Sequence, residues 1–479
     1  MRNLSALTDL YQLTMLNGYF KENKLEDYAV FDLFFRQNEQ FSYSIACGIV
    51  QAIEYIQNLS FTDEDIAYLR RLKLFEEDFL KYLKAFHFTG NVYAVPEGSV
   101  IFPHEPILTI EAPLLEAQFV ETTLLNIINH QTLIATKSAR ICHEANGKKV
   151  FELGARRAQG PDAAIYGARA AMLGGCSATS NIYAGKAFGL PVIGTHAHAW
   201  VMSFDSELEA FRAYAALYPN NCTLLVDTYN TLKSGIPNAI QVFQELKEKG
   251  YTPKAIRLDS GDLAYLSKEA RKMLDSAGFT EIKIMASGDL DEHIIASLKN
   301  QGAKIDIYGV GTKLITSANM PALGGVYKLV ELRPKNKDKI YKIKLSNNIN
   351  KLTTPAMKVV YRIYNNETSK AEADLIALQD EEIDCKKPLT ITHPTERWKQ
   401  HTFTNFTVEK LTKLIMKNGK LVKPLPTLQQ SIAYAKEELN SFCDEYKRLD
   451  NPHVYKVDLS DKLYTIKNNL IAEIKDKNG

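Results

Sequence analysis

Short apolar runs followed by small or polar residues recur through residues 149–325. Their starts lie roughly 20 to 40 residues apart, which is the repeat of successive strand–helix units. After one run, Leu263 and Leu266 begin a helical stripe that Gly278 is expected to end. The pattern therefore predicts a parallel α/β sheet. The six runs are KVFEL, PVIG, TLLV, AIRL, IKIM and IDIYG.

We expect this sheet to close into a TIM-like α/β barrel over residues 137–330. Nearly every run ends in residues with candidate chemistry, and barrel enzymes assemble their sites from the C-terminal ends of many strands. An open, doubly wound sheet would gather its ligand groups at a single switch point.

The regions on either side of the barrel have a different texture. Residues 1–136 combine an amphipathic helical stretch (61–86) with extended runs rich in turn residues (92–113), which predicts an α+β domain. Residues 331–479 begin with a lysine-rich, hairpin-like segment and continue into an amphipathic helix that starts after prolines. Alternating lysines on a hairpin usually form a solvated edge, so no catalytic role is assigned to them. We expect a second, sheet-containing domain built from the N-terminal region and part of this C-terminal extension.

Composition excludes several classes of protein. Of the 479 residues 24% are charged, and 58 basic against 56 acidic residues give a net charge of +2. This charge provides no overall field to attract nucleic acid or an anionic membrane. The six cysteines are scattered and form no CxxC pair, which argues against structural zinc or a disulfide framework. No secretory signal is visible, and glycine and proline interrupt the longest charge-free stretch, Ala187–Phe204, so we expect a cytoplasmic protein.

Two histidines, His196 and His198, stand in the segment GTHAHAW at residues 194–200. On an extended segment, side chains at i and i+2 point to the same face. Three interpretations stay open: a metal pair, one ring acting as nucleophile or acid/base, and two hydrogen-bonded structural groups. The metal pair lacks further ligands, because His293 falls inside a predicted helix and the later histidines lie beyond the barrel.

Three strand ends offer material for binding an anion. Ser-Gly-Asp-Leu occurs twice, at 260–263 and 287–290, and Gly-Val-Gly-Thr occupies 309–312. Glycine permits close backbone approach, and serine with the following N–H groups can hold an anion. One isolated SGD is more often a helix cap, but three such ends in one array favour a phosphate site. The chain has no GxxxxGK[ST] and no GxGxxG opening a βαβ unit, so a nucleotide would bind without either fingerprint.

Charged residues lie at the same strand ends. Carboxylates beside a phosphate site suit ribose hydroxyls or Mg²⁺ held through substrate phosphates. Arginines suit forked recognition of a carboxylate or a phosphate. Together they predict a pocket for a small, multiply anionic, ribose-like substrate. The residues are Asp227, Asp259, Asp262, Asp289, Arg156, Arg157 and Arg257.

The chain contains seven ordered segments: LTDLYQ from residue 7, LGARRAQGPD from 153, GTHAH from 194, VDTY from 226, RLDSGDL from 257, GVGT from 309 and LGGVYK from 323. With these segments the chain resembles the nicotinate phosphoribosyltransferase family, the ATP-coupled enzymes of NAD salvage. The resemblance implies an α/β barrel with a second, sheet-containing domain, and a homodimer with substrate sites near the subunit boundary. It also implies formation of nicotinate mononucleotide and pyrophosphate from nicotinate and 5-phosphoribosyl 1-pyrophosphate, with Mg²⁺, coupled to ATP hydrolysis through a phosphohistidine.

The resemblance further implies roles for single residues. His198 matches the histidine that ATP phosphorylates. Thr195 and Arg257 match residues of the nicotinate site, and Tyr11 matches the aromatic that stacks on the pyridine ring from the neighbouring subunit. Thr312 matches a residue that contacts the 5-phosphate of the phosphoribosyl group.

The remaining roles follow from the chemistry of the implied reaction. Displacement of pyrophosphate passes through a transition state with oxocarbenium character, so the protein must position two anions and stabilise a cationic ribose. We assign Asp227 and Asp259 to ribose or Mg²⁺-linked contacts, with no direct protein ligand set for the metal. His196 matches a variable position, which weakens the metal-pair interpretation. The residues expected at the phosphoribosyl and pyrophosphate groups are Arg156, Arg157, Ser287, Gly288, Asp289, Gly309, Gly311 and Thr312.

Other functions compete with this interpretation. The nearest is a phosphoribosyltransferase of the same fold that uses nicotinamide or quinolinate. A metal-dependent barrel hydrolase and a non-catalytic pyridine-nucleotide sensor belong to other classes, and neither explains so many polar strand ends together.

Overall fold

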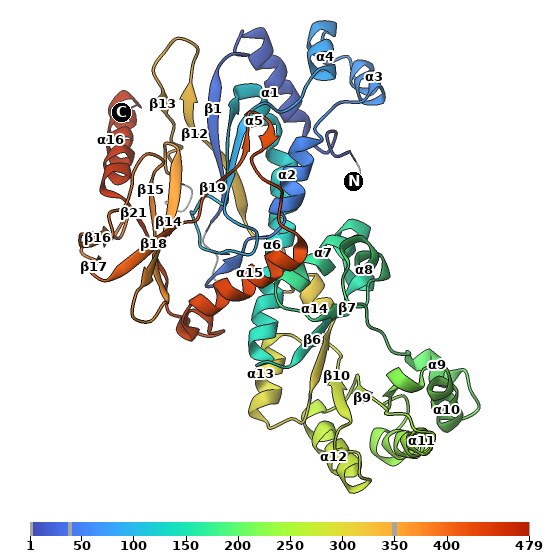
Figure 1. Ribbon diagram of the computed structural model, residues 1–479. Coiled ribbons are helices and arrows are strands. Elements are labelled where there is room, and N and C mark those ends of the chain that lie inside the picture. Colours follow the sequence, from blue (N-terminus) through green and yellow to red (C-terminus); the bar gives the residue numbers. More distant parts are fainter. Residues whose placement is uncertain (1–2, 37–40, 347–351, 479) are drawn as a thin grey trace. The chain divides into compact units, whose positions relative to one another are not determined.

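Contacts within the computed structural model, which describes residues 3–36, 41–346 and 352–478, divide the chain into two compact units (Figure 1). Unit 1 combines residues 1–133 with residues 322–479, and unit 2 is the intervening segment 134–321. Both ends of the chain therefore contribute to unit 1.

Unit 1 contains a seven-stranded antiparallel sheet that joins the two ends of the chain. Every residue of β1 after Tyr28 is buried, which fits the apolar residues on both faces of YAVFDLFF. β1 pairs with β12, so the N-terminal region cannot form this sheet alone. In spatial order the strands are β13 (Ile340–Tyr341), β12 (Gly325–Arg333), β1 (Tyr28–Phe35), β5 (Leu108–Pro113), β3 (Asn91–Ala94), β19 (Lys413–Lys417) and β20 (Lys420–Leu421).

A second, six-stranded mixed sheet in unit 1 comes from the C-terminal part of the chain. Its strands, in spatial order, are β17 (Gln400–Phe403), β16 (Leu389–Thr392), β21 (Lys456–Leu459), β15 (Ala371–Leu378), β14 (Lys358–Asn365) and β18 (Phe406–Lys410). A short ladder joins β2 (Ser44–Ile45) to β4 (Val100–Ile101). The helices are α1 (Leu10–Lys21), α2 (Ile49–Gln57), α3 (Asp63–Arg71), α4 (Glu77–Lys84), α5 (Leu114–Phe119), α15 (Leu428–Ser441) and α16 (Asp461–Asn478), and α6 (Glu121–Glu144) runs on into unit 2.

Unit 2 is built on a six-stranded parallel sheet whose strands alternate with helices. Five of the six predicted apolar runs form its strands, and the predicted helix after Asp262 is confirmed as α12. In spatial order the strands are β7 (Ala178–Thr179), β6 (Lys149–Glu152), β11 (Ile307–Val310), β10 (Lys283–Ala286), β9 (Ala255–Leu258) and β8 (Thr223–Leu225). The helices are α7 (Pro161–Leu173), α8 (Ile182–Phe188), α9 (His198–Met202), α10 (Glu207–Leu217), α11 (Ile236–Glu248), α12 (Leu263–Ser276), α13 (Glu292–Asn300) and α14 (Thr312–Ile315).

The strand pairing of unit 2 covers half a barrel, and within the described residues it does not close. Beyond β7, a single parallel bridge joins Thr179 to Val192. The PVIG run, expected to be a strand, forms only this bridge. Pro191 has no N–H, so it contributes its carbonyl alone, which accepts a hydrogen bond from Thr179. The mixed α/β fold is confirmed, and the closed barrel stays a prediction.

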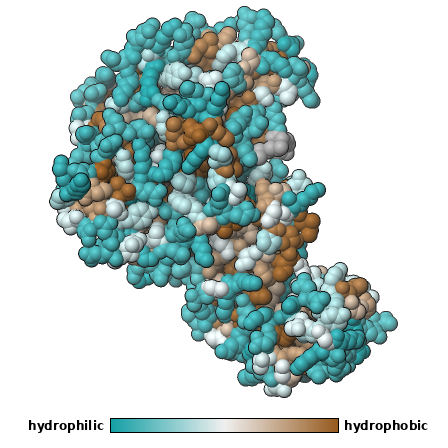
Figure 2. Space-filling view, in the orientation of Figure 1, coloured by the Kyte–Doolittle hydropathy of each residue, from teal (hydrophilic) through white to brown (hydrophobic). Residues whose placement is uncertain are grey.

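Hydrophilic residues cover most of the face of unit 1 seen in Figure 2, and apolar residues appear there as separate patches. In the part of the chain that the structure describes, no helix combines the length and the apolar character needed to cross a membrane.

A buried arginine holds four segments of unit 1 together. Arg362 on β14 is fully buried and donates to both carboxylate oxygens of Asp374 on β15, at 2.9 and 2.7 Å. It also donates to Glu438 of α15 at 2.5 Å and to the carbonyl of Val100 at 2.7 Å. Two buried carboxylates thus share one cation, and each would be costly without it.

We expect Arg362→Met to lower the free energy of unfolding by about 3–5 kcal/mol, because the two buried carboxylates lose the cation that they share. Chemical denaturation followed by circular dichroism measures the change. Arg70→Met, which removes an exposed pair with Glu77 in the same unit, should leave the midpoint almost unchanged. Equal midpoints for Arg362→Met and wild type would contradict the expectation.

Candidate active site

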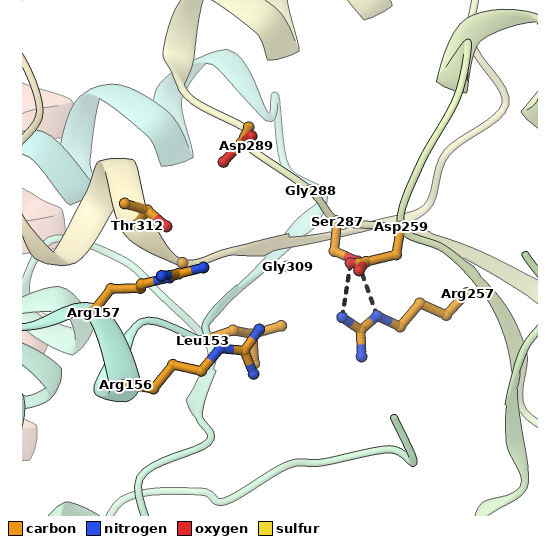
Figure 3. Close-up of a pocket in the computed structure, with 11 residues that line it drawn as sticks. Leu153, Arg156, Arg157, Arg257, Asp259, Ser287, Gly288, Asp289, Gly309 and Thr312 are labelled. Carbon is orange, nitrogen blue, oxygen red and sulfur yellow. Dashed lines mark hydrogen bonds and ion pairs between the residues drawn. The ribbon is translucent and has the colours of Figure 1, made fainter. Parts of the chain in front are cut away.

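A cavity of about 260 Å³ lies at the C-terminal ends of four parallel strands of unit 2, β6, β9, β10 and β11. Figure 3 shows arginine side chains facing it from two sides. Parallel strands bring their carboxyl ends to one edge, so loops distant in sequence meet there. The lining residues are Leu153, Arg156, Arg157, Arg257, Asp259, Ser287, Gly288, Asp289, Gly309, Gly311 and Thr312. All of them except Leu153 were expected from the sequence to be site residues.

Glycines let the strand ends approach one another closely. A Cβ on Gly288 would lie 2.3 Å from the carbonyl oxygen of Asp259, and Gly288 also has a φ of +95°. A Cβ on Gly309 would lie 2.6 Å from the side chain of Leu153. Side chains at these positions would push the loops apart, so glycine is needed for the shape of the pocket.

Two arginines face the pocket with their charges unbalanced. Arg156 and Arg157 lie on a 3-10 turn (Ala155–Arg157) directly after β6 and are exposed. They lie across the pocket from Arg257 (Figure 3). Among the described residues neither guanidinium has a carboxylate partner, so both are available to an anionic ligand.

A buried carboxylate orients the turn that carries these arginines. Glu152, at the end of β6, accepts from the N–H of Gly154 at 2.5 Å and from the hydroxyl of Thr179 at 2.6 Å. Burial raises the pKa of Glu152, although both hydrogen bonds act to lower it. Glu152 was not among the expected site residues, and its position at the end of a buried strand, just before the arginines, was the signal for it.

The opposite side of the pocket is organised around Arg257 and Asp259. Arg257 donates to Ser287 at 2.9 Å, to Thr195 at 3.0 Å and to Asp259 at 2.8 Å. Ser287 also donates to Asp259. Burial would raise the pKa of Asp259, but the hydrogen bond from Ser287 and the charge of Arg257 outweigh burial and lower it. Asp259 is therefore an ionised carboxylate at neutral pH.

Asp227 lies beside this pair and supports the neighbouring turn. One of its oxygens accepts from the N–H of Asp259 at 2.8 Å and from the hydroxyl of Ser260 at 2.6 Å. Its other oxygen, Oδ1, is buried without a hydrogen-bond partner. A buried acceptor in this state suits a hydroxyl donor or a cation.

The two Ser-Gly-Asp-Leu copies have different roles. Ser287, Gly288 and Asp289 line the pocket, whereas Asp262 caps α12 by accepting from the N–H of Tyr265 at 2.9 Å. The expectation that Asp262 contributes to the acidic group of the pocket is therefore wrong. After the second copy the cap is Asp291, two residues further on, which leaves Asp289 free to face the pocket.

The two histidines of GTHAHAW point to different partners. His198 begins α9, with Nδ1 3.1 Å from the hydroxyl of Thr228 and Nε2 3.7 Å from Asp259. His196 instead accepts through Nε2 from the N–H of Leu225 at 3.2 Å. The expectation that both rings share a face is wrong, because the extended segment ends where the helix begins. No group of three or more potential metal ligands occurs among the described residues.

Thr228 was also not singled out from the sequence, although a polar residue directly after Asp227 at a strand end was the available signal. Tyr11 lies in unit 1, on the first turn of α1, with its side chain 48% exposed. Its proposed stacking role stays a prediction.

Family models match almost the whole chain. The N-terminal domain model of nicotinate phosphoribosyltransferase matches residues 6–129, the family model matches 148–375 and the C-terminal domain model matches 357–467. The chain is 48% identical over 476 residues to the nicotinate phosphoribosyltransferase of Bacillus subtilis, covering 99% of this chain and 96% of the relative. The chain belongs to the nicotinate phosphoribosyltransferase family.

Other curated relatives and solved structures are similar over nearly the whole chain. The nicotinate phosphoribosyltransferase of Dictyostelium discoideum is 36% identical, with 97% of this chain and 87% of the relative covered. The crystal structure of human nicotinic acid phosphoribosyltransferase superposes with a TM-score of 0.85 at 30% identity, covering 97% of this chain and 99% of the human one. The Pyrococcus furiosus structure named nicotinate-nucleotide pyrophosphorylase has a TM-score of 0.70 at 23% identity, covering 92% of this chain and 96% of that one, and shows a shared fold.

We expect Gly288→Ala to weaken the binding of inorganic pyrophosphate by about tenfold or more. The new Cβ would press against the carbonyl oxygen of Asp259, and holding the loop in its present shape against such a contact costs about 1–3 kcal/mol. Titration calorimetry measures the affinity. Gly302→Ala is the matched control, because Gly302 also has a positive φ (+73°) but a Cβ there meets nothing within 4 Å. An equal loss of affinity in both variants would mean that backbone strain alone, and not the approach to Asp259, is responsible.

Proposed function

We propose that this protein forms nicotinate mononucleotide and pyrophosphate from nicotinate and 5-phosphoribosyl 1-pyrophosphate. The observation that carries the proposal is a pocket in which two unpaired guanidinium groups face a half-buried Arg257–Asp259 pair across glycine-lined strand ends. The names of the full-length relatives agree with this reaction. NAD salvage is the corresponding physiological role.

The phosphate groups of the substrate are assigned to the side of the pocket where Arg156 and Arg157 carry unpaired positive charge. Arg156 and Arg157 would neutralise the leaving pyrophosphate. Gly309 and Gly311 would let phosphate oxygens approach the backbone, and the hydroxyl of Thr312 would donate to the 5-phosphate. The loop Ser287, Gly288 and Asp289 would complete this side.

Nicotinate is assigned to the Arg257 side. Of the five N–H donors of a guanidinium, Arg257 uses three on Ser287, Thr195 and Asp259, which leaves two for a carboxylate. Thr195 would help to define the edge of the ring. We propose that Tyr11 of a neighbouring subunit stacks on the pyridine in a homodimer.

The ribose is assigned to the two aspartates. As C1 loses pyrophosphate, positive charge develops on the ribose, and the ionised Asp259 is placed to stabilise it. The unpartnered Oδ1 of Asp227 can accept from a ribose hydroxyl or from water on Mg²⁺. Mg²⁺ would neutralise charge on the substrate phosphates, and the chain supplies oxygen acceptors without a closed ligand set.

His198 is the proposed phosphate acceptor from ATP. Its ring lies between Thr228 and Asp259, and a phosphate on it adds nearly two negative charges beside the pocket. This negative charge would repel the carboxylate of Asp259 and attract the guanidinium of Arg257. Movement of the loops that carry them would couple ATP hydrolysis to synthesis. We further infer a cytoplasmic enzyme whose strands are arranged as an α/β barrel opened between Val192 and β8.

The proposal is tested by incubating the purified protein with phosphoribosyl pyrophosphate, Mg²⁺ and one pyridine at a time, with and without ATP. We expect nicotinate mononucleotide from nicotinate, with ADP when ATP is present. Little product is expected from nicotinamide, because its amide leaves Arg257 poorly paired, and quinolinate is the second comparison. Product from nicotinamide at an equal rate would overturn the assignment. In His198→Ala, the stimulation of product formation by ATP should disappear. Full stimulation in this variant would contradict the proposed phosphohistidine.

We expect Arg257→Ala to raise the Michaelis constant for nicotinate by about 10- to 100-fold, since a hydrogen bond to a charged group contributes about 1.5–3 kcal/mol. Steady-state kinetics with each substrate varied in turn measures the effect. Arg156→Ala is the comparison, with its main effect expected on phosphoribosyl pyrophosphate. The assignment of nicotinate to Arg257 fails if both variants change the same constant.

A further inference from the structure

His196 occupies a buried position at the open edge of the parallel sheet. Its side chain is 7% exposed. In the described sheet β8 is an outer strand that pairs only with β9. The N–H of Val226 donates to the backbone carbonyl of Arg257 on the β9 side. Because backbone groups alternate along a strand, the N–H of Leu225 points to the other side.

The imidazole satisfies this edge group. Leu225 is 1% exposed, so its N–H cannot rely on water. It donates to Nε2 of His196 at 3.2 Å. The side chain therefore supplies the acceptor that a carbonyl of a neighbouring strand would supply in a continuous sheet.

The surroundings of the ring keep it in the form that can accept. Burial lowers the pKa of His196 to about 4, and the nearby charges of Arg257 and His198 act in the same direction. The ring packs against Tyr214 and Phe211 of α10, with centroids at 4.7 and 6.1 Å. With Nε2 accepting, the proton lies on Nδ1, which faces the carbonyl of Ala197 at 3.5 Å.

The loop that carries His196 has few other attachments. Ile193 donates to Thr179 of β7, and the next backbone N–H that donates to another backbone group within the described chain is that of Trp200. Between these two points lie Thr195, which contacts Arg257, and His198, which lies beside Asp259. Both side chains depend on the position of this loop.

We propose that His196 is a positioning residue that fastens the loop of Thr195 and His198 to the edge of β8 through its neutral imidazole. The inference rests on the proposed function of those two residues. It predicts that loss of the acceptor displaces the nicotinate and ATP-coupling groups while leaving the Arg156 side of the pocket, on β6, in place.

The test compares His196→Leu, which fills the space without an acceptor, with His196→Gln, whose amide oxygen can replace Nε2. In His196→Leu we expect the Michaelis constant for nicotinate to rise about tenfold and ATP stimulation to fall, because small displacements of positioned groups have large effects. The constant for phosphoribosyl pyrophosphate should change less than about twofold, and His196→Gln should recover most of the loss.

Phe211→Leu is the control for packing, because it disturbs the same ring contact and keeps the hydrogen bond. It should lower stability without the selective effect on nicotinate. Imidazole ¹⁵N signals of the wild type give a readout independent of turnover: His196 should stay neutral with its proton on Nδ1 at pH 6.

A selective loss in His196→Leu, rescue in His196→Gln and a neutral ring support the inference. It is overturned if both substrates are affected equally, if Phe211→Leu reproduces the pattern, or if the ring is protonated at pH 6. If His196→Leu does not fold, His196→Gln and the ¹⁵N signals of the wild type test the inference instead. A wild-type protein that forms no nicotinate mononucleotide would instead reject the proposed function, while the ring signals would still test the attachment to β8.

Discussion

The ion pair between Arg257 and Asp259 is the interaction on which the rest of the site depends. The two residues are two positions apart at the end of β9, so their side chains point to the same face of the strand. A guanidinium or a carboxylate alone would be costly in this partly buried position, and each is satisfied by the other and by Ser287. Because Thr195 and His198 contact the same pair, the ends of two strands, β9 and β10, and one long loop are ordered by a single charge pair. Charges that the protein's own hydrogen bonds hold in place are the arrangement in which they stabilise a transition state most effectively.

The same pair determines what charge the pocket offers to a ligand. Its lining holds three arginines and two aspartates, and Asp259 already neutralises Arg257. The free positive charge is thus displaced toward Arg156 and Arg157, away from the paired side. A multiply charged phosphate group meets the unpaired guanidinium groups, whereas a single carboxylate can use the remaining N–H donors of Arg257. The net charge of +2 for the whole chain conceals this separation, since it averages one small basic pocket over 479 residues.

The sequence predicted the strand ends of this site well and their connections less well. Buried strands are recognisable in the sequence as apolar runs, and the polar residues just after them lie at one edge of a parallel sheet. Arg156, Ser287 and Thr312 could therefore be expected to lie together. Strand β7 could not be expected in this way, because two small buried residues carry too weak a pattern. Nor could the contrast between Asp262 and Asp289, since identical tetrapeptides become a cap or a pocket wall according to where the next helix begins. The spacing of His196 and His198 predicted that both side chains share a face. This prediction assumes a continuous extended segment, whereas α9 begins at His198.

At the edge of the described parallel sheet, a side chain bonds to β8 where a further strand could have paired. A paired strand would satisfy the N–H of Leu225, but it would also commit the backbone on either side to a ladder. One imidazole satisfies that N–H, and among the described residues no backbone N–H between Ile193 and Trp200 donates to another backbone group. The proposed attachment at His196 lies between Thr195 and His198 and keeps both near Arg257 and Asp259, while the rest of the loop can adjust to the proposed phosphate on the ring of His198. In the proposed mechanism this combination matters, because a fully laddered loop would respond less to phosphorylation of His198, and a loop without the attachment would not hold the ring beside Asp259.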